Sequence, residues 1–115
     1  MIFGRRRFRD VVGRQLMLFA QDHDELVQRA RASLRSYSDE TDPAAALERY
    51  ADFEDASEDI EDLLYDMCDR FSSTLDEPMA KRYAAEFDRQ ARKAYRDVIP
   101  RLSVLQRPDE DDAES

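Results

Sequence analysis

Residues 53–71 read FEDASEDIEDLLYDMCDRF and contain eight carboxylates but only one basic residue, Arg70. On a helix, where successive residues are rotated by about 100°, the apolar side chains of this segment fall on one stripe. Its aspartates fall on the other side. The segment therefore predicts an amphipathic helix with the apolar stripe turned inward. The inward residues are Phe53, Ala56, Ile60, Leu63, Met67 and Phe71, and the outward ones are Asp55, Asp59, Asp62, Asp66 and Asp69.

Apolar residues spaced by three and four also occur on both sides of this segment and predict three helices in all. These are expected over residues 8–36, 43–75 and 78–99. His23 fills the one gap in the first apolar stripe and is interpreted as a residue at the edge of the core. The other expected core positions are Phe8, Val12, Leu16, Phe19, Leu26, Ala30, Leu34, Leu47, Tyr50, Met79, Tyr83, Phe87, Ala91, Ala94, Tyr95, Val98 and Ile99.

The predicted helix boundaries carry their own sequence signals. Asp42 before Pro43 is typical of an N-cap followed by proline at the first helical position. The sequence DEP at residues 76–78 repeats this pattern, with Asp76 or Glu77 as the cap. Pro100 is expected to kink or end the third helix.

Short connections between long helices place consecutive helices side by side and antiparallel. The predicted fold class is therefore all-α, an antiparallel up-down-up three-helix bundle, and a dimer that adds further helices is also open to it. The bundle is expected over residues 8–103. A basic N-terminal segment over 1–7 precedes it, and a disordered acidic tail over 104–115 follows it.

The composition narrows the class of protein. A chain of 115 residues has room for one domain, and its net charge of −9 argues against a specific nucleic-acid partner. No apolar run approaches the roughly 20 residues of a membrane span, and the first residues lack the apolar stretch of a secretory signal. The single cysteine, Cys68, cannot form an internal disulfide, which favours a reducing cytoplasm.

The charged residues are dominated by arginine and aspartate, with sixteen Arg against two Lys and seventeen Asp against ten Glu. Aspartate-rich surfaces with few lysines are typical of salt-adapted proteins, although GC-rich coding also produces an arginine excess. The acidic face of residues 53–71 is open to two interpretations. It is either screened by dissolved cations or binds a divalent metal or a partner. A di-iron site is excluded, because it needs Glu-x-x-His pairs from two helices and the chain has one histidine.

The sequence GRRRFR at residues 4–9 is a second candidate surface. Four arginines near a helix N-terminus are unfavourable for the helix dipole. The segment is therefore interpreted either as a loose basic start or as a contact site for phosphate groups, lipid or nucleic acid. Cys68 has only Arg70 nearby to activate it and is interpreted as a small, semi-buried side chain.

The sequence DPAAALERYADFEDASEDIEDLLYDMCDRF, residues 42–71, resembles the second helix of the PhoU family of phosphate-uptake regulators. Asp55-Ala-Ser-Glu-Asp59 matches the acid-xxx-Asp motif of that family. DEPMAKRYA, residues 76–84, is similar to its turn into the third helix, and MIFGRRRFRDVV is similar to the start of related phosphate-transport regulators. The resemblance covers residues 3–100, one three-helix repeat where family members usually carry two. The second acidic motif is changed to Lys93-Ala-Tyr-Arg-Asp97.

The resemblance implies a non-enzymatic adapter that modulates phosphate uptake or signalling. Its partners would be the ATPase of a phosphate transporter or a sensor kinase, and homo-oligomerisation would replace the missing repeat. Family members bind iron, zinc or magnesium on the acidic motifs, so a divalent metal would fall to Asp55, Asp59 and Asp97. The expected partner-binding residues are Asp62, Asp66 and Asp69 on the acidic face, together with Arg5, Arg6 and Arg7.

Two alternatives stay open. One is a general helical interaction protein without a phosphate link. The other is enzymatic, because EDIEDLLY at residues 58–65 is similar to the acidic helix of MazG-type nucleotide pyrophosphohydrolases, which hold Mg²⁺ between acids of two helices. The second set of acids would come from Asp22-His23-Asp24-Glu25, and both sets would have to face inward.

Overall fold

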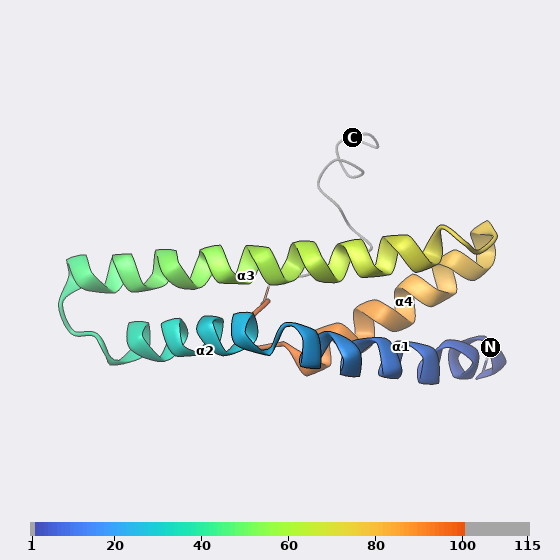
Figure 1. Cartoon of the computed structure of the whole chain (residues 1–115), viewed down its shortest axis with the longest axis horizontal. Helices are drawn as coiled ribbons and strands as arrows, with labels where there is room; N and C mark the ends of the chain where they lie inside the picture. The colour runs from blue at the N-terminus through green and yellow to red at the C-terminus, as the bar shows by residue number, and fades with distance from the viewer. Residues whose placement is uncertain (1, 101–115) are drawn as a thin grey trace.

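The computed structural model describes the backbone of residues 2–100 and the side chains of residues 7–100. This part of the chain forms four helices and no strand (Figure 1). The all-α prediction is confirmed. The predicted three-helix bundle is not found, because the first expected helix is divided in two. The helices are α1 (Ile2–Asp22), α2 (Asp24–Asp39), α3 (Pro43–Ser72) and α4 (Glu77–Ala94).

The structure describes the predicted boundary near the N-terminus but not the one near the C-terminus. Residues 2–7, predicted as a separate basic segment, belong to α1. Residues 101–115, which include the predicted acidic tail, lie outside the described part of the chain.

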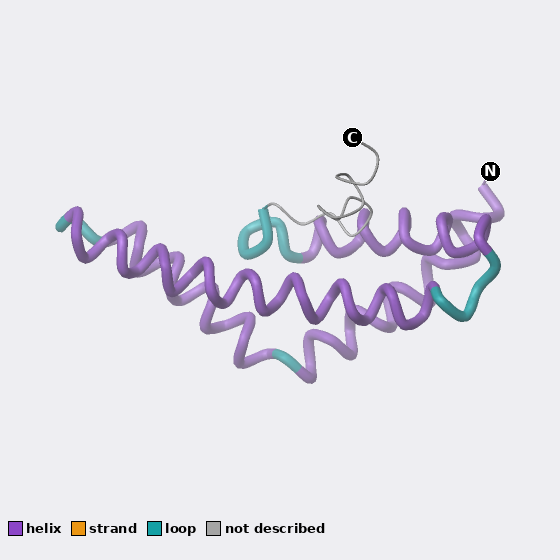
Figure 2. The backbone as a smooth tube through the Cα atoms, turned by 90° about the horizontal axis from the view of Figure 1, so that it is seen from above, coloured by secondary structure: helices purple, strands orange, loops and turns teal. Residues whose placement is uncertain are grey.

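The chain changes direction at His23, the single residue between α1 and α2. Its backbone has φ −122° and ψ 30°, and its side chain makes no capping hydrogen bond to α2. The half-buried imidazole packs on the preceding turn, with its ring centre 4.8 Å from that of Phe19. Figure 2 shows the bend at the short loop between the two helices. His23 therefore marks a break in the helix and not a position within a continuous one.

Charge favours the start of a new helix after His23, although neither glycine nor proline is present. Asp24 and Glu25 occupy the first turn of α2, where the helix dipole favours negative charge. In a continuous helix these acids would lie in the interior, where that stabilisation is absent. The bend also allows α1 to pack on α4 while α2 packs on α3.

The four helices form an assembly of uneven thickness. α2 and the first part of α3 are an antiparallel pair, and α4 returns along the other end of α3 to pack against both α3 and α1 (Figure 1). The assembly thus has two helices side by side at the α2 end and three at the α1 end. No helix in the described residues is long and apolar enough to cross a membrane.

The starts of α3 and α4 agree with the cap signals in the sequence. The side chain of Asp42 accepts a hydrogen bond from the backbone N–H of Ala45 at 3.0 Å. Asp76, and not Glu77, caps α4 by accepting from the backbone N–H of Met79 at 3.0 Å. Each bond satisfies one of the backbone donors that a helix N-terminus leaves without a partner, so the cap fixes where the helix begins.

The last helix ends earlier than the sequence suggested. α4 stops at Ala94, and the chain then turns, with the N–H groups of Val98 and Ile99 both bonded to the carbonyl of Tyr95 at 3.0 and 2.9 Å. This turn places Tyr95, Val98 and Ile99 in the core. Ala94 was predicted to be buried, but it is exposed, because the apolar residues that follow reach the core through the turn and not along the helix.

The core involves all four helices. Burial of Phe53, Ala56 and Ile60 confirms the first half of the predicted α3 stripe. In the second half the inward face is shifted by one residue, because Leu64 and Cys68 are buried instead of Leu63 and Met67, where α3 packs against α4. Leu47 was predicted as a core residue and is 74% exposed, since it lies where only two helices are packed together.

Candidate functional site

An acidic stripe runs along the exposed side of α3, and the structure makes it longer than the quoted segment suggested. Its carboxylates alternate at spacings of three and four, so they repeat every seven residues and stay on nearly the same side of the helix. The stripe covers 21 helical positions after its first residue, or roughly 32 Å. Its members, all exposed, are Glu48, Asp52, Asp55, Asp59, Asp62, Asp66 and Asp69.

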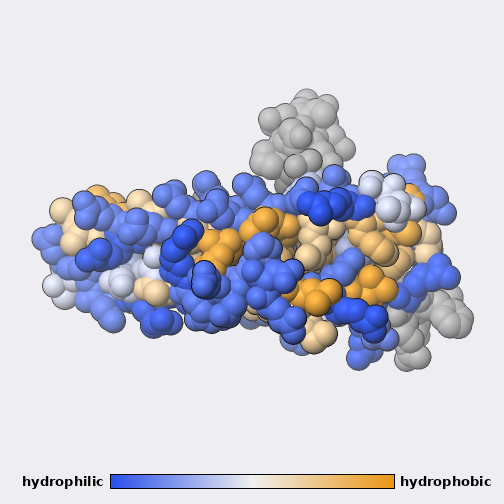
Figure 3. All heavy atoms as spheres, viewed as in Figure 1, coloured by the Kyte–Doolittle hydropathy of each residue, from blue (hydrophilic) through white to orange (hydrophobic). Residues whose placement is uncertain are grey.

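Few of these carboxylates have a basic neighbour. Asp59 lies 3.8 Å from a nitrogen of Arg29, and both side chains are more than half exposed. Asp66 pairs with Arg70 one turn along the same helix. The other five members of the acidic stripe make no ion pair with any described residue. Figure 3 shows the hydrophilic edge that α3 presents. The stripe therefore carries negative charge that the described fold leaves largely unneutralised.

The metal-binding residues expected from the family resemblance do not come together. Asp55 and Asp59 are neighbours on α3, whereas Asp97 lies in the turn after α4 and bonds to Arg31 of α2 at 2.9 Å. Among the described residues there is no group of three or more His, Cys, Asp or Glu side chains that could hold a metal ion. Two carboxylates on an open helix face can attract a divalent ion, so binding at Asp55 and Asp59 alone stays a prediction.

The acids required by the hydrolase alternative are turned outward. Asp59 and Asp62 are exposed on α3, and so are Asp22, Asp24 and Glu25 around the bend. A magnesium site of that type needs acids that face each other across two helices. These residues do not adopt that arrangement in the described structure.

Two buried carboxylates on α4 escaped the sequence analysis. The carboxylate of Glu86, 4% exposed as a residue, accepts bonds from Arg89 at 2.6 and 3.2 Å and from Gln90 at 2.6 Å. Asp88 pairs with Arg92 at 3.0 Å. The bond and charge of Glu86 raise the pKa of Arg89. The sequence contained one signal of these buried pairs, because each acid is followed by an arginine three or four residues later. A charge at a buried position needs such a partner.

Cys68 is buried on the inner side of α3 and is not activated. Burial raises the pKa of its thiol to about 12, and the negative charges of Asp69 and Asp88 add to the effect. Since the thiolate is the nucleophilic form, this side chain is unreactive at neutral pH. It is a small core residue, more deeply buried than the semi-buried side chain expected from the sequence.

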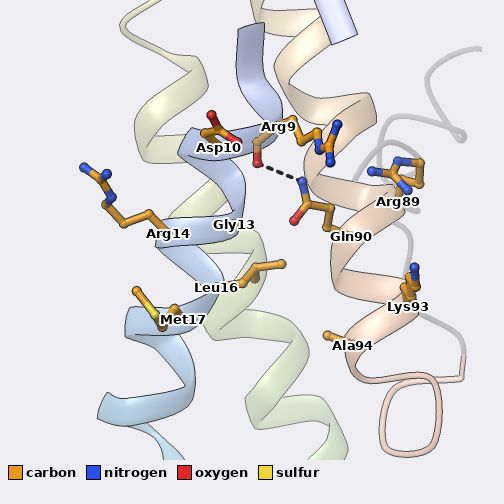
Figure 4. Close-up of a pocket in the computed structure, with 10 residues that line it drawn as sticks. All are labelled: Arg9, Asp10, Gly13, Arg14, Leu16, Met17, Arg89, Gln90, Lys93 and Ala94. Carbon is orange, nitrogen blue, oxygen red and sulfur yellow. Dashed lines mark hydrogen bonds between the residues drawn. The ribbon is translucent and has the colours of Figure 1, made fainter. Parts of the chain in front are cut away.

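A basic groove lies between α1 and α4, and the sequence analysis did not anticipate it (Figure 4). Four cationic side chains line it, Arg9 and Arg14 from α1 and Arg89 and Lys93 from α4, against a single acid, Asp10. Arg9, Arg14 and Lys93 make no ion pair with any described residue. The groove therefore offers positive charge on a protein that is acidic as a whole.

The floor and walls of the basic groove are partly apolar. Leu16, Met17 and Ala94 contribute apolar surface, and Met17 is 55% exposed. The amide of Gln90 joins the two walls by donating to the backbone carbonyl of Arg9 at 3.0 Å (Figure 4). The basic groove has a volume of about 1070 Å³, so it is large enough for several residues of an extended chain.

The N-terminal arginines predicted as a contact surface lie at the start of α1. Arg7 is exposed, and its guanidinium comes within 4.0 Å of the sulfur of Met79. The side chains of Arg5 and Arg6 lie outside the described residues. The helix they belong to continues to the basic groove, where Arg9 follows Arg5 by one turn.

The net charge of the chain conceals a strong separation of charge between helices. α1 contains five arginines against two aspartates, whereas α3 contains ten carboxylates against two arginines. Because like charges are gathered on separate helices, each presents a field of its own to a partner. Sequence-wide charge therefore did not indicate the basic groove, although Arg89 and Lys93, four residues apart on one helix face, were a local signal.

Comparison of the chain with models of known protein families, with curated proteins and with solved structures gave no match. The function is therefore argued from the surfaces of the chain itself.

Proposed function

We propose that this protein is a non-enzymatic adapter that binds a basic protein surface through the acidic stripe of α3. The observation that carries the proposal is that five of the seven stripe carboxylates have no ion-pair partner among the described residues. A partner that supplies arginine or lysine at matching positions would neutralise this charge. Charge complementarity of this kind accelerates association and disfavours partners of the wrong sign.

The form of the scaffold supports the same proposal. The stripe lies on a single helix of 30 residues whose opposite side is held in the core by Phe53, Ile60 and Leu64. The carboxylates are thus presented at fixed spacing, and little conformational freedom of the backbone is lost when a partner binds.

The resemblance to the PhoU family suggests a cellular role for the proposed adapter. It suggests that the adapter modulates phosphate uptake or signalling in the cytoplasm, as a homo-oligomer. The ATPase of a phosphate transporter or a sensor kinase would then supply the basic surface. Asp55 and Asp59, the residues that match the acidic motif of that family, lie within the stripe.

The proposal is tested by affinity capture of the tagged protein from phosphate-replete extract of its own cells at native salt. The stripe variant combines Asp55→Asn, Asp62→Asn and Asp69→Asn, which removes three charges that have no ion-pair partner in the described structure. The control variant combines Asp22→Asn, Asp39→Asn and Glu77→Gln, which removes the same number of exposed charges elsewhere.

We expect a phosphate-transport ATPase or permease, or a sensor kinase, to be recovered with the wild type and the control but lost with the stripe variant. Recovery that is equal with all three chains would refute the role of the stripe. Recovery of an unrelated partner that still depends on the stripe would support the general interaction protein instead. Recovery of nucleotide-metabolism proteins would direct attention to a magnesium-dependent hydrolysis assay.

A further inference from the structure

We propose that the basic groove between α1 and α4 binds residues 109–114 of the same chain, whose sequence is DEDDAE. This interaction goes beyond the proposed function, because it concerns a different surface and an occupant within the chain. The inference rests on charge and on the length of chain that joins the segment to the last described residue.

The charges of the groove and the segment are complementary. The segment carries five carboxylates in six residues. The groove has three cations without ion-pair partners in the described structure, Arg9, Arg14 and Lys93, and a fourth, Arg89, that is already bonded to Glu86. Figure 4 shows the side chains of Arg9, Arg89 and Lys93 on the side of the groove where α4 lies, while Arg14 extends from the opposite side of α1.

The other large charged surface of the protein repels the same segment. The acidic stripe places seven carboxylates along α3, and only two of them have a basic partner. Two exposed charges of equal sign repel within the Debye length of about 8 Å at physiological salt. A segment rich in acid is therefore driven away from α3 and toward the helices that carry an excess of cations.

The connecting chain is long enough to reach. Lys93 and Ala94 line the groove, and the description of the chain ends six residues later at Pro100. Residues 101–108 join Pro100 to the acidic segment, and eight extended residues span up to about 26 Å. Pro100 lies beside Tyr50 and Phe53 of α3. The shortest extent of the molecule is 22 Å, so the reach is comparable with the thickness of the helices around which the connection passes.

Because the segment is attached to the same chain, weak electrostatic contacts are sufficient to hold it in the groove. A short connection gives the segment an effective concentration near the groove on the order of millimolar, without any further contact surface. The attraction is between exposed charges, so it is expected to weaken as salt is added. A bound segment would also compete with any acidic ligand that enters the groove.

Paramagnetic broadening in the full chain tests this proposal. A nitroxide is attached through Ser115→Cys, next to the acidic segment, while Cys68 is buried and its thiol stays protonated. We expect loss of amide peak intensity at residues 9–17 of α1 and 89–94 of α4, and recovery of that intensity at about 0.5 M salt, where the Debye length is about 4 Å. The unsubstituted chain, treated with the same reagent, shows whether Cys68 takes up any label.

Matched variants assign the effect to the groove. Arg9→Gln, Arg14→Gln and Lys93→Gln together should restore the peak intensities. Arg35→Gln, Lys81→Gln and Arg82→Gln together remove three exposed cations that neither line the groove nor form ion pairs in the described structure, and should leave the broadening unchanged. Circular dichroism confirms that each variant keeps its helices.

Three results would overturn the proposal: no broadening at low salt, broadening that is centred on α2 or α3, or broadening that persists in the groove variant. Mixing labelled chains with isotope-enriched, unlabelled chains detects contact between molecules. Broadening in that mixture as strong as in the labelled chain itself would assign the segment to a second copy and reject binding within one chain. These measurements do not depend on whether the acidic stripe binds a partner.

Discussion

The hydroxyl of Tyr83 donates a hydrogen bond to the side-chain oxygen of Gln15 at 2.6 Å and so joins α4 to α1. The ring of Tyr83 is fully buried where three helices meet. It contacts the rings of Phe8 on α1, Phe71 on α3 and Phe87 on α4, with centres 5.6, 4.6 and 5.9 Å away. Burial raises the pKa of Tyr83. One residue thus combines the packing of three helices with a polar bond between two of them.

Replacing Tyr83 with phenylalanine should lower the free energy of unfolding by about 0.5–1.5 kcal/mol, because the ring stays and the hydrogen bond is lost. Urea unfolding followed by circular dichroism measures the change. A double-mutant cycle with Gln15→Leu separates the bond from other effects of each substitution. If the two changes are additive, the bond does not contribute to stability.

Phe53 and Phe71 should contribute differently to the free energy of unfolding, although the sequence placed both on one stripe. Phe53 is 3% exposed, whereas Phe71 is half-buried. Phe53→Ala is therefore expected to cost about 3–5 kcal/mol and Phe71→Ala clearly less. Denaturant unfolding of the two variants side by side tests this order. An equal cost would mean that Phe71 is as deeply packed as Phe53.

Asp42→Ala should lower the free energy of unfolding by about 1 kcal/mol, because it removes the side-chain acceptor that the backbone N–H of Ala45 uses. Asp42→Asn keeps an acceptor at the same position and serves as the control. Thermal unfolding of the wild type and the two variants measures these differences in stability. A loss in the asparagine variant as large as in the alanine variant would show that the charge of Asp42, and not its capping bond, stabilises α3.

Cys68 should make stability fall at alkaline pH. Burial raises the pKa of its thiol from 9.0 to about 12 in the folded protein, so between these values the unfolded chain releases a proton that the folded chain keeps. The contribution to stability is full below about pH 9 and is lost as pH rises toward about 12, by at most about 1.4 kcal/mol per pH unit. Urea unfolding at pH 8 and pH 10 measures it.

The control for this pH dependence is Cys68→Ala, which has no thiol to ionise. Its stability should change less between pH 8 and pH 10 than that of the wild type, even though the smaller side chain lowers stability at both. The buried hydroxyl of Tyr83 acts in the same direction at higher pH, which is why the comparison stops at pH 10. A parallel decline in both chains would exclude Cys68 as the cause.

Neutralising part of the acidic stripe should leave the fold intact and slightly stabilise it at low salt. Asp55 and Asp62 lie four residues before Asp59 and Asp66, and each such like-charge pair costs about 0.2–0.5 kcal/mol in a helix. Asp55→Asn with Asp62→Asn should therefore raise the melting temperature in dilute buffer. Loss of helicity in this variant would instead assign the stripe a structural role.

The same variant tests adaptation to salt. Added KCl screens repulsion along the stripe, so the stability of the wild type should rise with KCl, and that of the variant should rise less. Thermal unfolding over a series of KCl concentrations provides both slopes. A wild-type stability that does not increase with KCl would contradict the interpretation of the composition as salt-adapted.

Local features of the fold were predictable from the sequence, whereas features that join distant residues were not. The capping of α3 by Asp42 and the outward direction of the aspartates on α3 follow from neighbouring residues and were predicted, and the cap of α4 was narrowed to Asp76 or Glu77. The break at His23 was missed because no glycine or proline marks it. The basic groove was missed because its two walls are some 80 residues apart in the sequence, as shown by the bond from Gln90 to Arg9.

The sequence by itself determined that the chain is helical, where α3 begins, and that one side of α3 is acidic, because periodicity and caps act over a few residues. The tertiary structure decided that the first expected helix divides at His23, that Leu64 and Cys68 face the core, and that Glu86 is buried and paired with the exposed Arg89. These features depend on which helices meet. Packing between distant segments selects among helix rotations and bends that local periodicity leaves nearly equal in energy.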